Sequence, residues 1–142
     1  MKILHILDHS LPLQSGYTFR SQNIFRSQKN MGYTPVILTS PKHEESLKIQ
    51  TPQIEEINGF TYYRTGPVKS SLPLVFELKL MHVLYKRILN VVRIEKPDII
   101  HAHSPVLNAI PAIRAARKLK IPVVYEIRAF WEDAAADLSA SF

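Results

Sequence analysis

The sequence predicts an α/β domain with a parallel sheet, helices on both faces and a β-hairpin after the second strand. Three observations support this fold class. Short apolar runs alternate with helical segments from Lys2 to Ile127, which is the pattern of βαβ units. The first run is nearly continuous, as expected of a strand buried on both faces. Asn58-Gly59 is a strong hairpin signal, because both turn positions need positive φ. Together these features are typical of a Rossmann-like domain.

The first βαβ unit begins at the N-terminus. We predict a buried strand over Lys2–Leu7 and a helix over Tyr17–Met31, with Gly32 as the helix stop. Pro35–Thr39 is predicted as the second buried strand. Residues 40–53 are polar and interrupted by prolines, so we expect a loop there.

A hairpin and a long helix follow. Ile54–Ile57 and Phe60–Arg64 flank the Asn-Gly turn and are predicted as its two strands. Pro73 can occupy the first turn of a helix, and apolar residues then recur at spacings of three, four and seven up to Glu95. This spacing predicts one long amphipathic helix.

Two more strands complete the predicted sheet, over Asp98–Ala102 and Ile121–Ile127. Between them, Ser104 is placed as an N-cap before a first-turn proline, and the helix should run to about Leu119. Pro111 lies inside this helix, where its missing N–H and its ring cost about 3 kcal/mol. We therefore expect a kink or a restart at Pro111.

Length, charge and composition limit the function classes. A chain of 142 residues with 46% hydrophobic composition is expected to form one domain. The net charge of +6 favours anionic partners, but no dense Lys or Arg block indicates nucleic acid. The absence of cysteine excludes disulfides and thiolate metal sites. No apolar run approaches the roughly 18 residues that a membrane span needs, and we predict a cytoplasmic protein.

The end of the chain reads as an interrupted domain. Residues 134–142 look like the beginning of a helix that has no companion strand. A doubly wound domain normally continues with another βα unit. We therefore predict that residues 1–142 are a truncated N-terminal domain.

Polar residues occur where several predicted strands end. Asp8 and His9 follow the first strand, His103 follows the strand that begins near residue 98, and Arg128 follows the last one. Ligands of parallel α/β sheets bind outside the carboxyl ends of the strands, so these residues are site candidates. Gly16 precedes the first helix, where free N–H groups and the helix dipole suit a phosphate.

Structural explanations remain open for the same residues. A glycine before a helix is as often simple turn chemistry. Glu126 and Arg128 can form an ordinary ion pair, and Glu132 and Asp133 can be first-turn acids that complement a helix dipole. The residues alone therefore do not decide between a binding site and local stabilisation.

Metal and dinucleotide sites are not expected. His101 and His103 point the same way on a strand, but the sequence offers no evident third ligand. No D-x-D motif suggests a divalent ion. The first loop lacks G-x-G-x-x-G, and Thr39-Ser40 provides no carboxylate for an NAD ribose.

Three basic residues of the long helix, Lys79, Lys86 and Arg93, fall on one stripe opposite its apolar face. An exposed charged face is one explanation. The other is a basic surface that rests on anionic lipid, as a peripheral enzyme with a membrane-held acceptor would need.

Four segments together resemble a known family. LDHSLPLQSGYTFR, LTSPKH, HAHSPVLNAIPA and YEIRAFWED occur in the order found in the N-terminal domain of group 1 glycosyltransferases of GT-B architecture. The chain is similar in particular to bacterial members linked with exosortase and exopolysaccharide gene clusters. The resemblance covers essentially residues 1–133.

The resemblance implies two Rossmann-like domains with a cleft between them. The N-terminal domain would bind mainly the acceptor, a glycan or a lipid-linked sugar, and the C-terminal domain, absent here, the nucleotide-sugar donor. The implied reaction is retaining transfer from a nucleotide sugar. Because no D-x-D motif occurs, we expect no metal or other cofactor, and the basic stripe of the long helix suits a cytoplasmic protein peripheral to the inner membrane face. The fragment alone is expected to be inactive.

The resemblance also implies residue roles. Gly16 matches the glycine near the donor diphosphate, although many relatives have a Gly-Gly pair there and this chain has Ser15-Gly16. His103 matches a histidine close to the transferred sugar and is the catalytic candidate. The acceptor-binding candidates are Asp8, His9, Lys42, Arg128, Glu132 and Asp133.

Two other functions fit the same fold. The domain can be a free-standing module that binds carbohydrate or phosphate, or part of a sugar-nucleotide epimerase of similar architecture. An epimerase would interconvert products without an acceptor.

Overall fold

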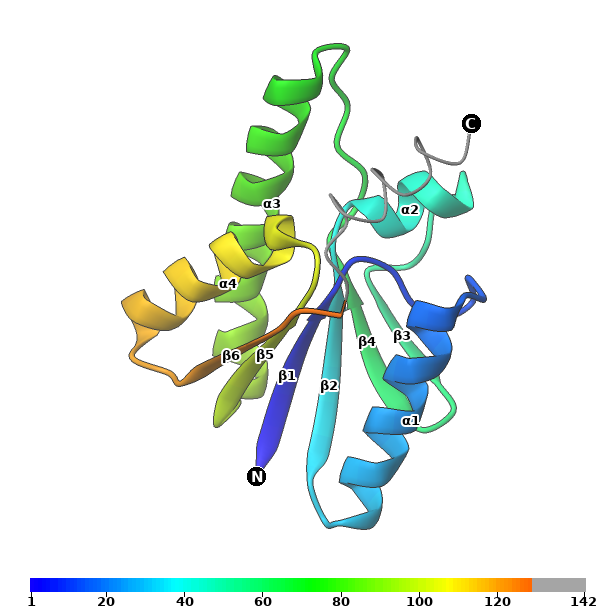
Figure 1. Cartoon of the computed structure of the whole chain (residues 1–142), viewed down its shortest axis with the longest axis vertical. Helices are drawn as coiled ribbons and strands as arrows, with labels where there is room; N and C mark the ends of the chain where they lie inside the picture. The colour runs from blue at the N-terminus through cyan, green and yellow to red at the C-terminus, as the bar shows by residue number, and fades with distance from the viewer. Residues whose placement is uncertain (129–142) are drawn as a thin grey trace, which may run out of the picture.

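The computed structural model describes residues 1–128 and confirms the Rossmann-like α/β class. Its elements, in chain order, are β1 (Lys2–Leu7), α1 (Gly16–Asn30), β2 (Thr34–Thr39), α2 (Lys42–Leu47), β3 (Ile54–Ile57), β4 (Phe60–Arg64), α3 (Pro73–Glu95), β5 (Ile99–His103), α4 (Val106–Leu119) and β6 (Val123–Glu126). The strands form one sheet in the order β3-β4-β2-β1-β5-β6. Every neighbouring pair is parallel except β3 and β4. Helices lie on both faces, with α3 and α4 on one and α1 on the other (Figure 1).

The face covered by α3 and α4 holds the larger core. Side chains alternate along β1, so Leu4 and Ile6 point to this face. They belong to one buried cluster with Leu84 and Ile88 of α3 and Ala112 of α4. The prediction that β1 is a central strand buried on both faces is confirmed.

The opposite face is covered by α1. Phe25 of α1 is completely buried with Leu7, Ile37 and Tyr62, and burial of such a side chain contributes roughly 1.5–3 kcal/mol. His5 of β1 points to this face too, and its ring centroid lies 4.8 Å from that of Phe25. A polar ring in this layer needs hydrogen-bond partners.

The predicted helix stop and hairpin are confirmed. Helix α1 ends at Asn30, and Gly32 has a φ of +87°, which favours glycine after a helix. β3 and β4 pair antiparallel around Asn58 and Gly59, whose φ values are 53° and 80°. These two left-handed residues produce the tight turn that the sequence indicated.

The expectation that residues 40–53 form only a loop is wrong, because Lys42–Leu47 form the short helix α2. Two contacts with other segments hold it, of which the one to Ser10 is buried. Thr51 Oγ1 donates to Glu44 Oε1 at 2.7 Å, and the backbone N–H of Ser10 donates to Nδ1 of His43 at 3.3 Å. A helix of six residues is too short for apolar periodicity, so tertiary contacts rather than pattern decide it.

The start of α4 also differs from expectation. Pro105, not Ser104, is the N-cap, and it makes no side-chain capping bond. The hydroxyl of Ser104 instead accepts the backbone N–H of Arg128 at 3.2 Å. The helix continues through the buried Pro111, so the predicted restart does not occur. Packing of this proline in the helix interface offsets the lost hydrogen bond.

Strand boundaries shift slightly. β5 ends at His103, one residue beyond the prediction, and β6 is shorter than predicted, with the bounds given above. Strand ends depend on pairing with a neighbour, which local sequence does not show. The helix predicted over 134–142 lies outside the described residues. Of the helices within residues 1–128, none has the length and apolarity needed to span a bilayer.

Candidate functional site

The carboxyl edge of the sheet brings several predicted site residues together. The parallel neighbours β1, β5 and β6 end at this edge. Nη2 of Arg128 donates to Nδ1 of His103 at 2.6 Å, and Nη1 donates to the carbonyl oxygen of Tyr17 at 2.9 Å. Tyr17 adjoins Gly16 in the first turn of α1. Gly16, His103 and Arg128 therefore belong to one region of the molecule.

A pocket of about 570 Å³ opens at this edge. Asp8 and His9, which follow β1, and Lys42 at the start of α2 line it. Its apolar wall comes from the start of α4, at Val106 and Leu107. The volume lies in the range of small-molecule sites. Three of the predicted acceptor-binding residues thus line one cavity.

A larger hollow of about 790 Å³ lies beside this pocket and shares Lys42 and Glu77 with it. It lies between α2 and the start of α3, where Phe76 contacts the ammonium of Lys42 with 5.4 Å between Nζ and the ring centroid. No strand ends in this hollow among the described residues. The smaller pocket is therefore the stronger site candidate.

Asp8, His9 and Ser15 form a hydrogen-bonded row in the loop between β1 and α1. Oδ2 of Asp8 lies 2.9 Å from Nδ1 of His9, and Nε2 of His9 lies 2.9 Å from Oγ of Ser15. Oγ of Ser15 also accepts the backbone N–H of Thr18 at 3.1 Å and so caps α1. The row joins the pocket to the N-terminus of α1.

Tyr17 holds this loop against the sheet. Its hydroxyl donates to the carbonyl oxygen of Ser104 at 2.9 Å and accepts the backbone N–H of Asp8 at 3.1 Å. Its ring lies between the ring of His9, at 4.7 Å, and the guanidinium of Arg128, at 4.2 Å. Burial raises the pKa of Tyr17 well above its usual value, so the hydroxyl keeps its proton.

Gly16 stands at the first position of α1 and is exposed. A Cβ built on it would meet no atom within 4 Å, and its φ is not in the left-handed region. Neither packing nor backbone conformation in residues 1–128 therefore requires glycine at this position.

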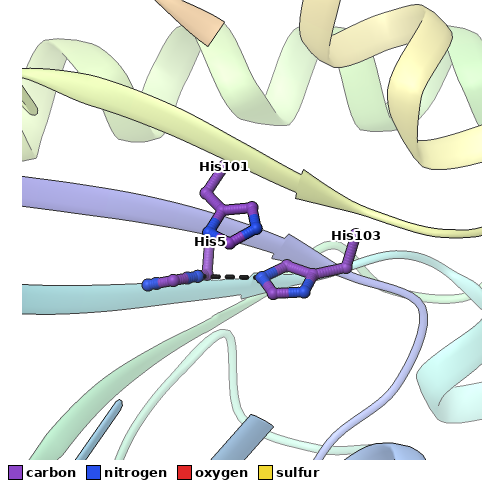
Figure 2. A group of neighbouring side chains, drawn as sticks. All are labelled: His5, His101 and His103. Carbon is purple, nitrogen blue, oxygen red and sulfur yellow. Dashed lines mark hydrogen bonds between the residues drawn. The ribbon is translucent and has the colours of Figure 1, made fainter. Parts of the chain in front are cut away.

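Three histidines lie together beneath this edge (Figure 2). Nδ1 of His5 lies 2.9 Å from Nε2 of His103, and Nε2 of His5 lies 2.8 Å from Oε1 of Gln28 in α1. Arg128 can only donate, so Nδ1 of His103 accepts and its Nε2 carries the proton. Nδ1 of His5 then accepts from His103, and Nε2 of His5 donates to Gln28. One direction of donation runs from Arg128 through both rings to Gln28.

The histidine rings are held neutral. Burial, followed by the nearby charge of His101 and Arg128, lowers the pKa of His103 to about 4, although Glu126 opposes this. Burial and the charge of His103 lower the pKa of His5 well below its usual value. A protonated ring would bring two N–H groups face to face, so the row requires neutral histidines.

Glu126 at the end of β6 collects several donors. Nη2 of Arg20 donates to its Oε1 at 2.8 Å, and Nε2 of His101 donates to its Oε2 at 3.0 Å. The guanidinium groups of Arg20 and Arg128 favour the charged carboxylate and hold the pKa of Glu126 well below its usual range. The carboxylate fixes the Nε2–H tautomer of His101.

Ligand atoms of His5, His101 and His103 lie within 4.8 Å of one another and so provide the third ligand that the sequence did not reveal. A metal ion lies in the plane of each imidazole that binds it. The rings of His101 and His103 are stacked instead, with centroids 4.1 Å apart at 17°. Both nitrogens of His103 also have protein partners. The geometry favours a hydrogen-bonded row, and the absence of a metal stays a prediction.

His103 is fully buried, so a contact with a sugar requires one of its partners to move. Its predicted catalytic role stays a prediction.

The predicted membrane-facing residues lie elsewhere. Lys79, Lys86 and Arg93 are exposed on α3 and do not line the pocket of Asp8 and His9. Glu132 and Asp133 lie outside the described residues.

Sequence reasoning missed His5, Gln28 and Tyr17 as members of this site. A histidine in the middle of an apolar strand, at His5, was a signal that a buried polar group needs partners. Gln28 and Tyr17 offered no comparable signal, because only the packing of α1 on the sheet places them here.

Comparison with known proteins gives one family match. A family model described as a glycosyl transferase 4-like domain matches residues 15–141. No curated protein sequence matches the chain.

Solved structures of similar fold belong to several kinds of protein. The C-terminal domain of a hydrogenase from Pyrococcus furiosus has a TM-score of 0.58 and 14% identity, covering 88% of this chain and 90% of that one. UDP-GlcNAc 2-epimerase from Neisseria meningitidis, bound to UDP-GlcNAc, has a TM-score of 0.60 and 18% identity, covering 88% and 31%. The calicheamicin glycosyltransferase has a TM-score of 0.58 and 12% identity, covering 89% and 32%. The chain thus spans about a third of the epimerase and glycosyltransferase chains. At these identities the likeness shows the fold alone.

Proposed function

The chain belongs to the family of glycosyl transferase 4-like domains, and from this premise we propose that it is the acceptor-binding domain of a retaining glycosyltransferase. The enzyme would transfer a hexose-type sugar from a nucleotide-sugar donor to a glycan or lipid-linked acceptor, as in exopolysaccharide synthesis. A second domain would bind most of the donor, so this chain alone would be inactive. No metal or other cofactor enters the proposal.

The pocket lined by Asp8, His9 and Lys42 is the observation that carries the proposal. Carboxylate, imidazole and ammonium groups can hydrogen-bond the hydroxyl groups of a sugar acceptor or pair with a phosphate on it. The apolar wall at Val106 and Leu107 can cover the less polar face of a sugar ring. An acceptor bound in this pocket would lie next to the N-terminus of α1.

The N-terminus of α1 supports the proposed donor contact. Ser15 caps the N–H of Thr18, and the N–H of Phe19 donates to the carbonyl oxygen of Ser15. The N–H groups of Gly16 and Tyr17 remain at the open end of the helix, where the dipole favours negative charge. Negative charge grows on the diphosphate as it leaves, so these groups would stabilise the transition state.

The replacement Gly16→Ala is expected to separate stability from donor binding. A Cβ meets nothing in the domain, and alanine favours helix over glycine by up to about 1 kcal/mol, so stability should stay equal or rise slightly. The same methyl group would keep a phosphate from the backbone, and loss of a hydrogen bond to a charged group costs about 1.5–3 kcal/mol, or roughly ten- to hundredfold in donor affinity. Urea unfolding and the donor KM of the full-length protein measure the two effects.

Gly32→Ala is the matched control. Gly32 has positive φ after α1, so this change should lower stability without changing donor KM. An unchanged donor KM in Gly16→Ala would contradict the proposed phosphate contact.

The direct test of the proposed function uses the full-length protein with UDP-GlcNAc, the ligand in the Neisseria epimerase structure, and other common nucleotide sugars. Transfer with retained anomeric configuration, observed by NMR of the product, supports the proposal. Absence of transfer or hydrolysis with every donor overturns it. Interconversion of UDP-GlcNAc and its C2 epimer without an acceptor would support the alternative epimerase function, which the epimerase-like fold keeps open.

We also propose that α3 rests on anionic lipid at the cytoplasmic face of the membrane. Lys79, Lys86 and Arg93 are exposed at seven-residue spacing, and Leu74 and Leu78 are exposed at the start of the same helix. Basic side chains near an anionic surface contribute about 1 kcal/mol each. Combined apolar and basic groups are typical of peripheral membrane binding.

Changing these three basic residues to glutamate is therefore expected to lower binding to vesicles with anionic phospholipid by roughly a hundredfold or more. Co-sedimentation measures the binding. The control changes the exposed cations Arg117, Lys118 and Lys120 of the C-terminal end of α4 to glutamate, with the same total charge change. Equal losses in both variants would show that net charge, and not this helix, governs any binding.

A further inference from the structure

We propose that His9 accepts the proton of the acceptor hydroxyl during transfer and that Asp8 orients its ring for this step. The inference rests on the proposed glycosyl transfer and assigns a chemical role to a residue that was expected only to bind the acceptor. Its basis is the row of Asp8, His9 and Ser15 at the edge of the pocket.

The partners of His9 determine where its proton lies. A carboxylate only accepts, so Asp8 makes Nδ1 of His9 the N–H donor across 2.9 Å. Nε2 is then the basic atom, and it lies 2.9 Å from Oγ of Ser15, whose hydroxyl proton is within reach of both this nitrogen and Oγ1 of Thr18 at 3.2 Å. General-base chemistry requires a histidine that is hydrogen-bonded to the reacting hydroxyl group and oriented by a carboxylate.

The position of His9 links the two halves of the proposed site. His9 lines the acceptor pocket, and its Nε2 is directed at Ser15, the residue before Gly16. An acceptor hydroxyl that replaces Ser15 as the donor to Nε2 would lie beside the proposed diphosphate contact. The base and the leaving group would then lie on the same side of the transferred sugar, which suits retention.

Asp8 and His9 are held in place before any ligand binds. The ring of His9 lies against Tyr17, with centroids 4.7 Å apart, and the Tyr17 hydroxyl accepts the backbone N–H of Asp8. The side chains of Asp8 and His9 are each 14% exposed, so solvent and ligand can reach them. His5 and His103, in contrast, are fully buried. All three histidines have protein partners on both ring nitrogens, but a substrate reaches Nε2 of His9 by replacing only the Ser15 hydroxyl.

The proton and electron balance of the step is simple. The acceptor oxygen forms a bond to the anomeric carbon as its proton moves to Nε2 of His9. The bond between that carbon and the diphosphate oxygen breaks, and the electron pair leaves with the nucleoside diphosphate. Asp8 stabilises the imidazolium that forms, and the proton then passes to solvent.

The first arm of the test locates the proton on His9 in this chain, by long-range ¹H–¹⁵N NMR at neutral pH. We expect Nδ1–H with unprotonated Nε2, and a shift toward Nε2–H in Asp8→Asn. A proton on Nε2 in the unmodified chain overturns the proposal, since that nitrogen could not accept another. This arm needs no activity, so it tests the required tautomer separately from the proposed transfer.

The second arm measures release of UDP from UDP-GlcNAc by the full-length protein, with water or an acceptor as nucleophile. His9→Ala is expected to lower kcat about a hundredfold or more, with partial rescue by added imidazole and loss of the acidic limb of the pH profile. His82→Gln, on the exposed face of α3, is the control. Wild-type turnover with an unchanged pH profile in His9→Ala overturns the inference but leaves the proposed function intact, whereas no turnover in the wild type counts against the proposed function.

Discussion

Replacing Arg64 by leucine is expected to lower the free energy of unfolding by roughly 3–5 kcal/mol. The side chain is 1% exposed, and its Nε pairs with Oε2 of Glu55 at 2.9 Å. Nη1 donates to the hydroxyl of Ser10 and Nη2 to the carbonyl oxygen of Leu11, each at 2.7 Å. Leucine fills part of the volume but leaves these acceptors without a donor, and unsatisfied buried groups account for the large cost.

The same change is also expected to loosen the loop that carries Asp8 and His9, because Ser10 and Leu11 follow these two residues directly. Arg64→Lys should recover less than half of the loss, since an ammonium cannot reproduce the planar fork of donors. Urea unfolding at neutral pH measures both variants.

Arg26→Leu on the exposed side of α1 is the matched control and should change stability by less than about 0.5 kcal/mol. A loss below about 1 kcal/mol in Arg64→Leu would show that water replaces the missing donor.

Acidification is expected to lower the free energy of unfolding, and this is the second large effect. Because the pKa of His103 is lowered to about 4 in the folded domain from an ordinary value of 6.5, the unfolded chain binds a proton first as pH falls. The contribution of His103 to the free energy of unfolding is therefore fully present above pH 6.5 and is lost as pH falls toward 4. His103 alone accounts for about 2 kcal/mol between pH 7.5 and pH 5. His5, whose pKa is also lowered, adds loss in the same direction.

Urea unfolding at several pH values between 7.5 and 5 measures this effect. Glu126 has a lowered pKa, so its contribution is present above the ordinary carboxyl pKa and is lost at lower pH. The loss of stability caused by the histidines is therefore measured above pH 5. His103→Gln should flatten the profile, whereas His82→Gln, exposed on α3, should leave it unchanged. A wild-type profile that is flat over this range would contradict the neutral, buried histidine row.

Much of the fold could be predicted because its signals are local. The continuous apolar run of β1, the Asn58-Gly59 turn and the spacing of α3 each act over a few residues. Helix α2 was missed because six residues show no period, and its stability comes from contacts of His43 and Glu44 with distant segments. The prediction for Ser104 failed for a similar reason, since its hydroxyl binds the backbone of Arg128 instead of capping α4.

The sequence by itself determined the kinds of element, the buried face of each strand and the polar character of the strand ends, because propensity, periodicity and turn chemistry depend on near neighbours. Only the tertiary structure decided which polar groups meet. It joined His5 to His103 across 98 positions and Arg128 to Tyr17 across 111. Strand order and register set these contacts, and they arise from packing of the whole sheet against its helices, which no short segment encodes.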